Sequence, residues 1–296
     1  MHDDQVEVST GIVAALVREQ FPEWRGEAIR RVASTGTVNA IFRIGDGLSA
    51  RFPLRLVDAG EALAVLEREA EASAELAHVS RFPVPEPVAL GKPGAGYPMP
   101  WSVQTWLPGT VASDADPSGS DAFAEDLAAF IAAMREAETR GRLFSGESRG
   151  GVLAHHDDWM AKCFEESEGL LDVPRLRQVW SRFRELPRTG ADVMSHGDLI
   201  PGNVLVTGDR LGGVLDTGGF GPADPALDLV SAWHLLQPGP RGVLRRTLDC
   251  DDLEWERGKA WAFEQAMGLV WYYAETNPTM SSMGRRTLDR ILESME

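Results

Sequence analysis

The chain has 296 residues, of which 43% are hydrophobic and 25% are charged. This composition is typical of soluble globular proteins and excludes collagen-like, disordered and membrane-spanning chains. The net charge of −16 repels phosphate backbones, which argues against nucleic acid as a partner. The same charge is compatible with attraction of a cationic small molecule and equally with a simple solubility role.

The two cysteines, Cys163 and Cys250, are too few for a disulfide framework and fit a reducing compartment. The N-terminal residues lack the basic segment of a signal peptide. No apolar run reaches the ~18 residues that a membrane helix needs. We therefore expect a cytoplasmic protein that does not associate with a membrane.

The first hundred or so residues have the pattern of a small antiparallel sheet with one helix packed on it. The Gly45-Asp46-Gly47 turn between two short apolar runs predicts a β-hairpin. Helical spacing covers residues 10–20 and 60–79, and strand patterns cover residues 39–44, 48–52, 84–90 and 101–106.

Pro108-Gly109 marks a change of character, after which helical patterns dominate. The exception is a predicted hairpin of residues 203–207 and 211–216 around Gly208-Asp209. The helices are expected at residues 122–138, 158–171, 175–186, 226–236, 252–276 and from 281 to the end. We therefore predict two domains, residues 1–106 and 107–296.

The residues that carry chemistry gather around this second hairpin. His196, Asp198 and Asn203 lie on the loop before it, and Asp216 ends its second strand. A hairpin brings such positions together, and carboxylate and amide oxygens suit Mg²⁺. A carboxylate that is not bound to the metal can accept a hydroxyl proton. This is the layout of a phosphoryl-transfer site.

Two motifs identify the relationship. Residues 196–203 read HGDLIPGN, and residues 224–229 read DPALDL. With these motifs, from Thr37 to about Asn277, the sequence resembles the aminoglycoside phosphotransferase family of small-molecule kinases. The resemblance implies an α+β, protein-kinase-like, two-lobed fold. Residues 1–106 would form a small antiparallel β lobe with one helix and a hinge near residues 101–107, and residues 107–296 a larger, mostly helical lobe.

The resemblance also implies roles for the residues of the second lobe. Asp198 would be the catalytic base, or would orient the attacking hydroxyl. Asn203 and Asp216 would bind Mg²⁺. His196 would brace the catalytic loop, and Asp228 would be a structural acid at a helix start, where a carboxylate also suits the helix dipole.

In the first lobe the resemblance implies a site for ATP or GTP. Arg51 would bind phosphate and would be held by Glu69. The loop over the phosphates would include Ser34, Thr35, Gly36 and Thr37, and backbone groups of Gln104, Thr105 and Trp106 would hold the adenine. The chain departs from the wider kinase pattern in three respects: Arg51 replaces Lys, the phosphate loop has a single glycine, and Thr217 follows the metal-binding Asp where kinases have Phe.

Two features argue against a protein substrate. Gly197 stands where protein kinases have Arg, and only a short segment separates Asp216 from Asp224. The acceptor is therefore expected to be a hydroxylated small molecule. The family suggests an aminoglycoside and a role in antibiotic resistance, while related kinases act on macrolides, choline, sugars or homoserine. A nucleotide-binding module without turnover and a metal-dependent hydrolase are the competing functions.

Three other patterns each have more than one interpretation. His155-His156-Asp157-Asp158 resembles a metal cluster but also the capped start of a helix or the edge of a substrate site. Residues 91–96, GKPGAG, resemble a phosphate loop but are interpreted as a strand connector because no helix follows. The helix over residues 252–276 carries aromatic residues that fit a core or an acceptor pocket, and acids that fit a solvated face or a cationic substrate. The aromatic residues are Trp261, Phe263, Trp271, Tyr272 and Tyr273, and the acids are Glu254, Glu256, Glu264 and Glu275.

Overall fold

The computed structural model describes residues 6–32, 38–146, 148–188 and 190–295. The chain divides into two compact units. Unit 1 comprises Met1–His78, Pro83–Pro108 and Val214–Gly219, and unit 2 comprises Val79–Phe82, Gly109–Gly213 and Phe220–Glu296. The short segment Val214–Gly219 thus belongs to unit 1 although it lies more than a hundred residues further along the chain.

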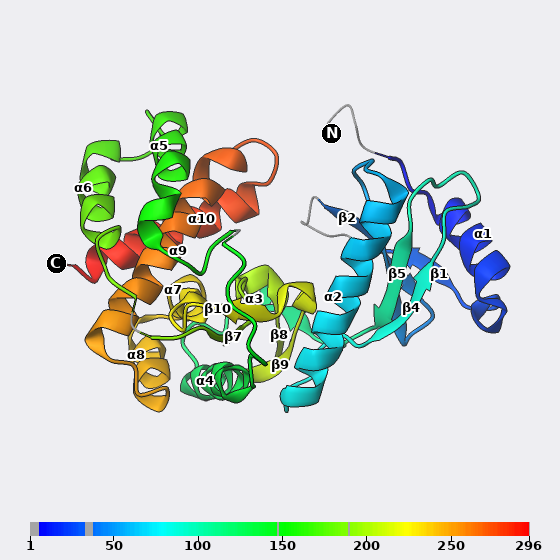
Figure 1. Cartoon of the computed structure of the whole chain (residues 1–296), viewed down its shortest axis with the longest axis horizontal. Coiled ribbons are helices and arrows are strands. Elements are labelled where there is room, and N and C mark those ends of the chain that lie inside the picture. Colours follow the sequence, from blue (N-terminus) through cyan, green and yellow to red (C-terminus); the bar gives the residue numbers. More distant parts are fainter. Residues whose placement is uncertain (1–5, 33–37, 147, 189, 296) are drawn as a thin grey trace. The chain divides into compact units, whose positions relative to one another are not determined.

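Unit 1 is built on a five-stranded antiparallel sheet with the order β1-β2-β3-β5-β4 (Figure 1). Gly45 turns the chain between β2 and β3 with a φ of +57°, a conformation that glycine adopts without steric cost. The strands are β1 (Ile29–Arg31), β2 (Asn39–Ile44), β3 (Leu48–Pro53), β4 (Pro87–Gly91) and β5 (Trp101–Thr105).

The two faces of this sheet have different partners. Alternate side chains such as Phe42, Ala50 and Phe52 are buried in a core shared with α1 (Thr10–Gln20). Since successive side chains of a strand point to opposite faces, Arg51 lies on the other face. That face borders a cavity whose other side is formed by α2 (Ala59–Val79).

Unit 2 is organised around α9 (Asp252–Tyr272), whose residues are buried on every side over most of its length. Two small sheets, β10-β7 and β6-β8-β9, carry the loops of the unit. The other helices are α3 (Ala112–Ala115), α4 (Asp121–Glu136), α5 (Asp157–Glu166), α6 (Val173–Phe183), α7 (Val230–Leu235), α8 (Pro238–Thr247) and α10 (Pro278–Glu293). The remaining strands are β6 (Thr110–Val111), β7 (Val193–Ser195), β8 (Val204–Thr207), β9 (Arg210–Val214) and β10 (Gly221–Ala223).

Most predicted elements are present with small shifts of their ends, and α1 coincides with its prediction. The structure adds α8, which is not among the predicted helices and begins with Pro238, Gly239 and Pro240. Proline is tolerated in the first turn of a helix, where the backbone N–H has no partner within the helix. The short strands β1, β6, β7 and β10 were also missed.

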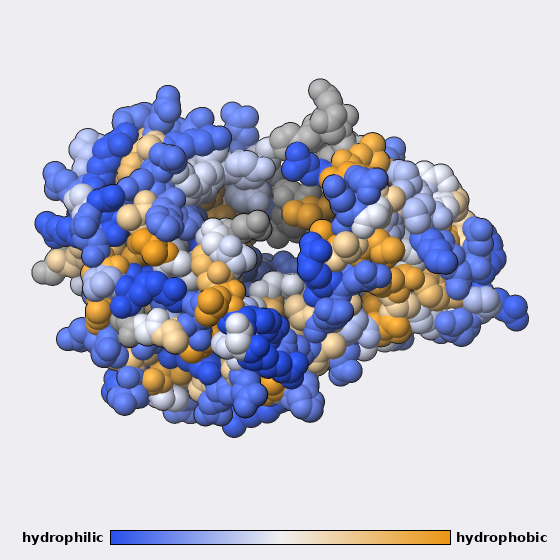
Figure 2. Space-filling view, viewed as in Figure 1, coloured by the Kyte–Doolittle hydropathy of each residue, from blue (hydrophilic) through white to orange (hydrophobic). Residues whose placement is uncertain are grey.

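Among the described residues, the structure contains no helix that is both long and apolar enough to cross a membrane. On the face shown in Figure 2, hydrophilic residues predominate and hydrophobic ones are scattered between them, as expected for a chain with net charge −16.

Candidate active site

The loop that carries Asp198 runs from β7 to the 3₁₀ turn Pro201–Asn203 and into β8. Its backbone is held by the buried carboxylate of Asp228, which accepts the N–H groups of His196 at 3.1 Å and of Gly197 at 3.0 Å. Gly197 has a φ of +81°, a region that favours glycine. The N–H of Asp198 donates to His196 Nδ1 at 3.3 Å. These contacts fix where the Asp198 side chain leaves the loop.

Three donors hold the carboxylate of Asp198. Its Oδ1 accepts Gln265 Nε2 at 2.6 Å and Arg149 Nη2 at 3.0 Å, and its Oδ2 accepts Asn203 Nδ2 at 3.1 Å. The side chain is 37% exposed, so the carboxylate remains accessible to a substrate. These hydrogen bonds hold the carboxylate in one orientation, which a general base needs.

The amide of Asn203 has a defined orientation. Its Nδ2 donates to both the main-chain oxygen of Asp198, at 3.0 Å, and Asp198 Oδ2. The amide oxygen is therefore directed away from the carboxylate. A neutral oxygen held in this way is a suitable ligand for a hard cation.

Arg149 and Gln265 were not anticipated from the sequence. Arg149 lies in a Gly- and Ser-rich loop with no recognisable pattern, and its ion pair with Asp198 spans 49 residues. Gln265 is a buried polar residue of α9 and directly follows the buried Glu264. Such a residue must find a partner, and this was the one available signal.

In unit 1 the predicted residues Arg51 and Asp216 meet. Arg51 Nη2 lies 2.7 Å from Asp216 Oδ1, and their side chains are 17% and 50% exposed. Asp216 has a φ of +58°, an uncommon conformation for a residue other than glycine. Among the described residues the ion pair of Arg51 is with Asp216, and the predicted pairing of Arg51 with Glu69 stays a prediction.

Glu69 nevertheless belongs to the same cluster. Burial raises the pKa of its carboxyl, the charge of Arg51 opposes that rise, and the charge of Asp216 adds to it. A carboxyl with a raised pKa beside two charged groups is typical of a functional site.

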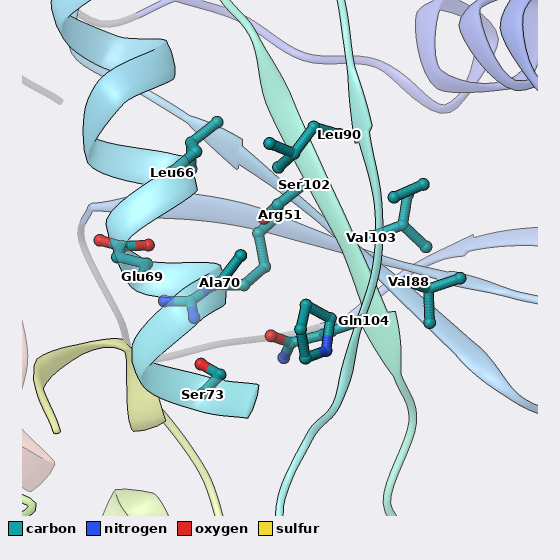
Figure 3. A pocket seen from close by; sticks show the side chains of 12 residues that line it. Arg51, Leu66, Glu69, Ala70, Ser73, Val88, Leu90, Ser102, Val103 and Gln104 are labelled. Atoms are coloured by element: carbon teal, nitrogen blue, oxygen red, sulfur yellow. The ribbon is translucent and has the colours of Figure 1, made fainter. Parts of the chain in front are cut away.

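A cavity of about 200 Å³ adjoins this cluster (Figure 3). Arg51 reaches from β3 toward α2, and the predicted nucleotide-binding residues Glu69 and Gln104 line the same space (Figure 3). Its walls are Arg51, Leu66, Glu69, Ala70, Ser73, Pro87, Val88, Ala89, Leu90, Ser102, Val103 and Gln104. The mixture of apolar walls with a few polar groups is typical of small-molecule sites.

The segment that carries Asp216 is attached to α2. Thr217 Oγ1 donates to Ser73 Oγ at 2.8 Å, and both hydroxyls are buried. Gly218 packs so tightly on Glu69 that a Cβ there would lie 2.8 Å from Glu69 Cγ. The Thr that replaces the usual Phe therefore anchors the segment by a hydrogen bond.

Two of the backbone groups predicted to hold the adenine have hydrogen-bond partners within the chain. The N–H groups of Thr105 and Trp106 already donate to the carbonyls of Glu86 at 2.9 Å and Gly47 at 2.8 Å. These two N–H groups are therefore already hydrogen-bonded within the chain and do not donate to an adenine. The predicted phosphate-loop residues, Ser34, Thr35, Gly36 and Thr37, lie outside the described residues.

The DPALDL motif contains a buried ion pair that the sequence analysis did not foresee. Asp224 faces Arg257, and both side chains are fully buried. Arg257 Nε and Trp261 Nε1 donate to Asp224 Oδ2 at 2.9 and 3.1 Å. Arg257 also donates to the carbonyls of Leu186 and Gly151, so its charge is well satisfied.

The ambiguous patterns have structural explanations. Asp157 and Asp158 lie in the first turn of α5, and Arg184 and Trp180 bind Asp157, which lowers the pKa of its carboxyl. Among the described residues there is no metal-type cluster of three or more His, Cys, Asp or Glu side chains. The GKPGAG segment connects β4 to β5 through a turn, as predicted.

The acids of α9 mostly have partners within the chain. Glu254 pairs with Arg135 at 2.6 Å, Glu256 with Lys259 at 2.6 Å, and Glu264 with His156 at 2.9 Å. Trp261 and Phe263 are in the core, whereas Tyr272 is half exposed. These acids therefore do not form a helix face of free carboxylates for a cationic substrate.

Comparison with solved structures shows the same fold in several phosphotransferases. The GDP complex of aminoglycoside 2'-phosphotransferase-IIIa matches with a TM-score of 0.71 and 17% identity, over 97% of this chain and 100% of that one. The macrolide 2'-phosphotransferase of Brachybacterium faecium matches with 0.61 and 18%, over 93% and 97%. The ADP-bound aminoglycoside phosphotransferase APH(2'')-Ib matches with 0.60 and 17%, over 96% and 99%. No curated protein was similar enough to count as a relative.

The fold and the Asp198 loop thus define a phosphotransferase with a kinase-like α+β fold, which confirms the predicted fold class. The model of the phosphotransferase enzyme family, APH, matches residues 29–261, and the chain belongs to that family. The predicted resemblance and the predicted enzyme class, a small-molecule phosphotransferase, are confirmed.

Proposed function

We propose that the enzyme transfers the γ-phosphate of ATP or GTP, with Mg²⁺, to a hydroxyl group of an aminoglycoside-like small molecule. The observation that carries the proposal is the Asp198 carboxylate, which is accessible and held by Arg149, Gln265 and Asn203. A carboxylate so oriented can align a hydroxyl and take its proton. It stands on the loop whose sequence gave the family resemblance.

In the proposed reaction the acceptor oxygen forms a bond to the γ-phosphorus, and the bond to the β–γ bridging oxygen breaks. The nucleoside diphosphate leaves with that electron pair. The hydroxyl proton passes to Asp198, which returns it to solvent after the product leaves. Positioning supplies most of the rate enhancement in this class of reaction.

Asn203 and Asp216 each carry an oxygen of the kind that Mg²⁺ prefers. Asn203 directs an amide oxygen away from Asp198, and Asp216 offers a half-exposed carboxylate, so both supply hard oxygens. We propose Asn203 and Asp216 as its ligands. When bound, Mg²⁺ would neutralise charge on the phosphate oxygens. Arg51 would then exchange its contact with Asp216 for the phosphates.

The nucleotide is proposed to bind in unit 1, where Arg51, Glu69 and Gln104 line one cavity. Structures with this fold hold GDP in one relative and ADP in another, which supports both ATP and GTP as donors. Cys163 and Cys250 are free and buried, which supports the proposed cytoplasmic location.

An aminoglycoside acceptor is favoured by two of the compared structures and is compatible with the net charge of −16. A macrolide is the second candidate, because a macrolide phosphotransferase shares the fold and because most acids of α9 have partners within the chain. No protein or nucleic-acid substrate is proposed.

The test is release of ADP or GDP with aminoglycosides, macrolides and small amino alcohols as acceptors. Asp198→Asn should lower kcat by about 10²- to 10⁴-fold, the range for general-base catalysis, and should leave nucleotide affinity unchanged. Asp209→Asn, exposed in the turn between β8 and β9, is the matched control and should retain full turnover. Turnover that survives in Asp198→Asn would refute the assignment of Asp198.

A further inference from the structure

A chain of buried polar side chains extends behind Asp198, away from the surface. Gln265 on α9 donates to Asp198 Oδ1 at 2.6 Å, and its Oε1 lies 3.1 Å from Nε2 of His234 on α7. His234 Nδ1 lies 2.9 Å from the hydroxyl of Thr287 on α10. Gln265, His234 and Thr287 are at most 6% exposed. Three helices thus converge on one carboxylate oxygen.

The orientation of the Gln265 amide follows from its neighbours. An ionised carboxylate only accepts hydrogen bonds, so the NH₂ group must face Asp198. The amide oxygen then faces His234. Because an amide oxygen cannot donate, His234 must carry its proton on Nε2.

The other ring nitrogen completes the chain. Burial lowers the pKa of His234 to about 3, although the hydrogen bond to Gln265 opposes this shift. The charges of Arg149 and Arg290 also lower the pKa, so the ring holds one proton at neutral pH. With that proton on Nε2, Nδ1 can only accept, and the donor available to it is the Thr287 hydroxyl. That hydroxyl also lies 3.0 Å from the carbonyl of Met283, but its single proton cannot serve both.

We propose that Gln265, His234 and Thr287 form a positioning chain that directs the catalytic oxygen of Asp198. Oδ1 already accepts from Gln265 and Arg149, whereas Oδ2 accepts only from Asn203 among the residues that the structure describes. Oδ2 therefore keeps a lone pair and receives the proton of the acceptor hydroxyl. The inference rests on the proposed function, because it assigns the working oxygen of that site.

Thr287→Val removes the hydroxyl with almost no change of shape. We expect kcat to fall about three- to tenfold, the effect of one hydrogen bond, with the KM for nucleotide unchanged. Gln265→Leu should lower kcat by about 10²-fold, because Asp198 loses its main support. His234→Leu should behave similarly, and His234→Gln, whose NH₂ can donate to Gln265, should recover part of the loss.

The matched control is Ser281→Ala, which removes another buried hydrogen bond between α10 and α9, from Ser281 Oγ to the carbonyl of Val270 at 2.8 Å. It does not lead to Asp198. Ser281→Ala should lower the unfolding temperature and keep kcat. Equal kcat in wild type, Ser281→Ala and Thr287→Val would overturn the positioning chain.

A second measurement does not depend on any variant folding. Nitrogen-15 NMR of the histidine ring in the wild-type protein at neutral pH should show His234 protonated on Nε2. A proton on Nδ1, or a charged ring, would overturn the chain. A wild-type enzyme that transfers phosphate to none of the acceptors would instead contradict the proposed function, and with it the need to position Asp198.

Discussion

Asp224 and Arg257 form a fully buried ion pair in unit 2. Both side chains have no exposed area, and Arg257 also binds two main-chain carbonyls. The pair joins the segment after β10 to α9 and to the loop at Gly151. Its partners come from three distant parts of the sequence.

Asp224→Asn should lower the free energy of unfolding by about 3–5 kcal/mol, because the buried charge of Arg257 loses its counter-charge. Urea unfolding followed by circular dichroism measures the change. Asp252→Asn is the control, since Asp252 pairs with Arg245 but is 97% exposed. It should cost about 1 kcal/mol or less. Similar losses in both variants would contradict the importance of burial.

His234 makes a different prediction, about pH. Its pKa is about 3 in the native state because of burial, while an unfolded chain keeps about 6.5. Between these values the unfolded state binds a proton that the native state does not. Stability should therefore fall as the pH falls from about 6.5, by up to about 1.4 kcal/mol per pH unit. Urea titrations over a range of pH measure this loss of stability, and His234→Gln should not show the part that comes from His234. If stability fell with pH in parallel for the wild type and His234→Gln, His234 would not be its cause.

At the level of elements, the position of Asp216 depends on α2. Ser73 and Glu69, one turn apart on this helix, contact Thr217 and Gly218. The helix therefore connects the wall of the cavity to the segment with the proposed metal ligand. A change in this packing should therefore change the affinity for nucleotide.

Gly218→Ala should weaken Mg²⁺–nucleotide binding several-fold, because the new Cβ would lie 2.8 Å from Glu69 Cγ and displace Asp216. The overpacking should also cost about 1–3 kcal/mol of stability. Calorimetric titration with ADP and GDP measures the affinity. Gly26→Ala in the same unit has open space around its Cβ and should bind as wild type does. If Gly218→Ala bound ADP and GDP as the wild type does, the packing of this segment on α2 would not influence nucleotide affinity.

At the level of the whole molecule, the net charge of −16 is the dominant property. Such a charge raises the local concentration of cationic ligands and is screened by salt. If the acceptor is a polycationic aminoglycoside, its kcat/KM should fall about tenfold between about 0.05 M and 0.5 M ionic strength. Steady-state kinetics with an acceptor of little charge is the control. If kcat/KM fell equally with salt for both acceptors, charge would not contribute to recognition of the acceptor.

Local patterns in the sequence determined much of the fold. Short strand-type runs predict β2 and β3, apolar spacing predicts α1, α2 and α4, and Gly45 marks the hairpin. The contiguous motif of residues 196–203 was sufficient to indicate the family. Short elements such as β1 and the proline-led α8 were missed, because neighbours, and not intrinsic propensity, stabilise them.

The tertiary structure decided which side chains serve the site. Arg149 and Gln265 reach Asp198 from 49 and 67 residues away, and Arg51 meets Asp216 across 165 residues. No spacing rule encodes such pairs, because they depend on how helices and loops pack. Residue types and local geometry are written in the sequence, whereas the choice of hydrogen-bond partner for a buried polar group follows from the packing that buries it.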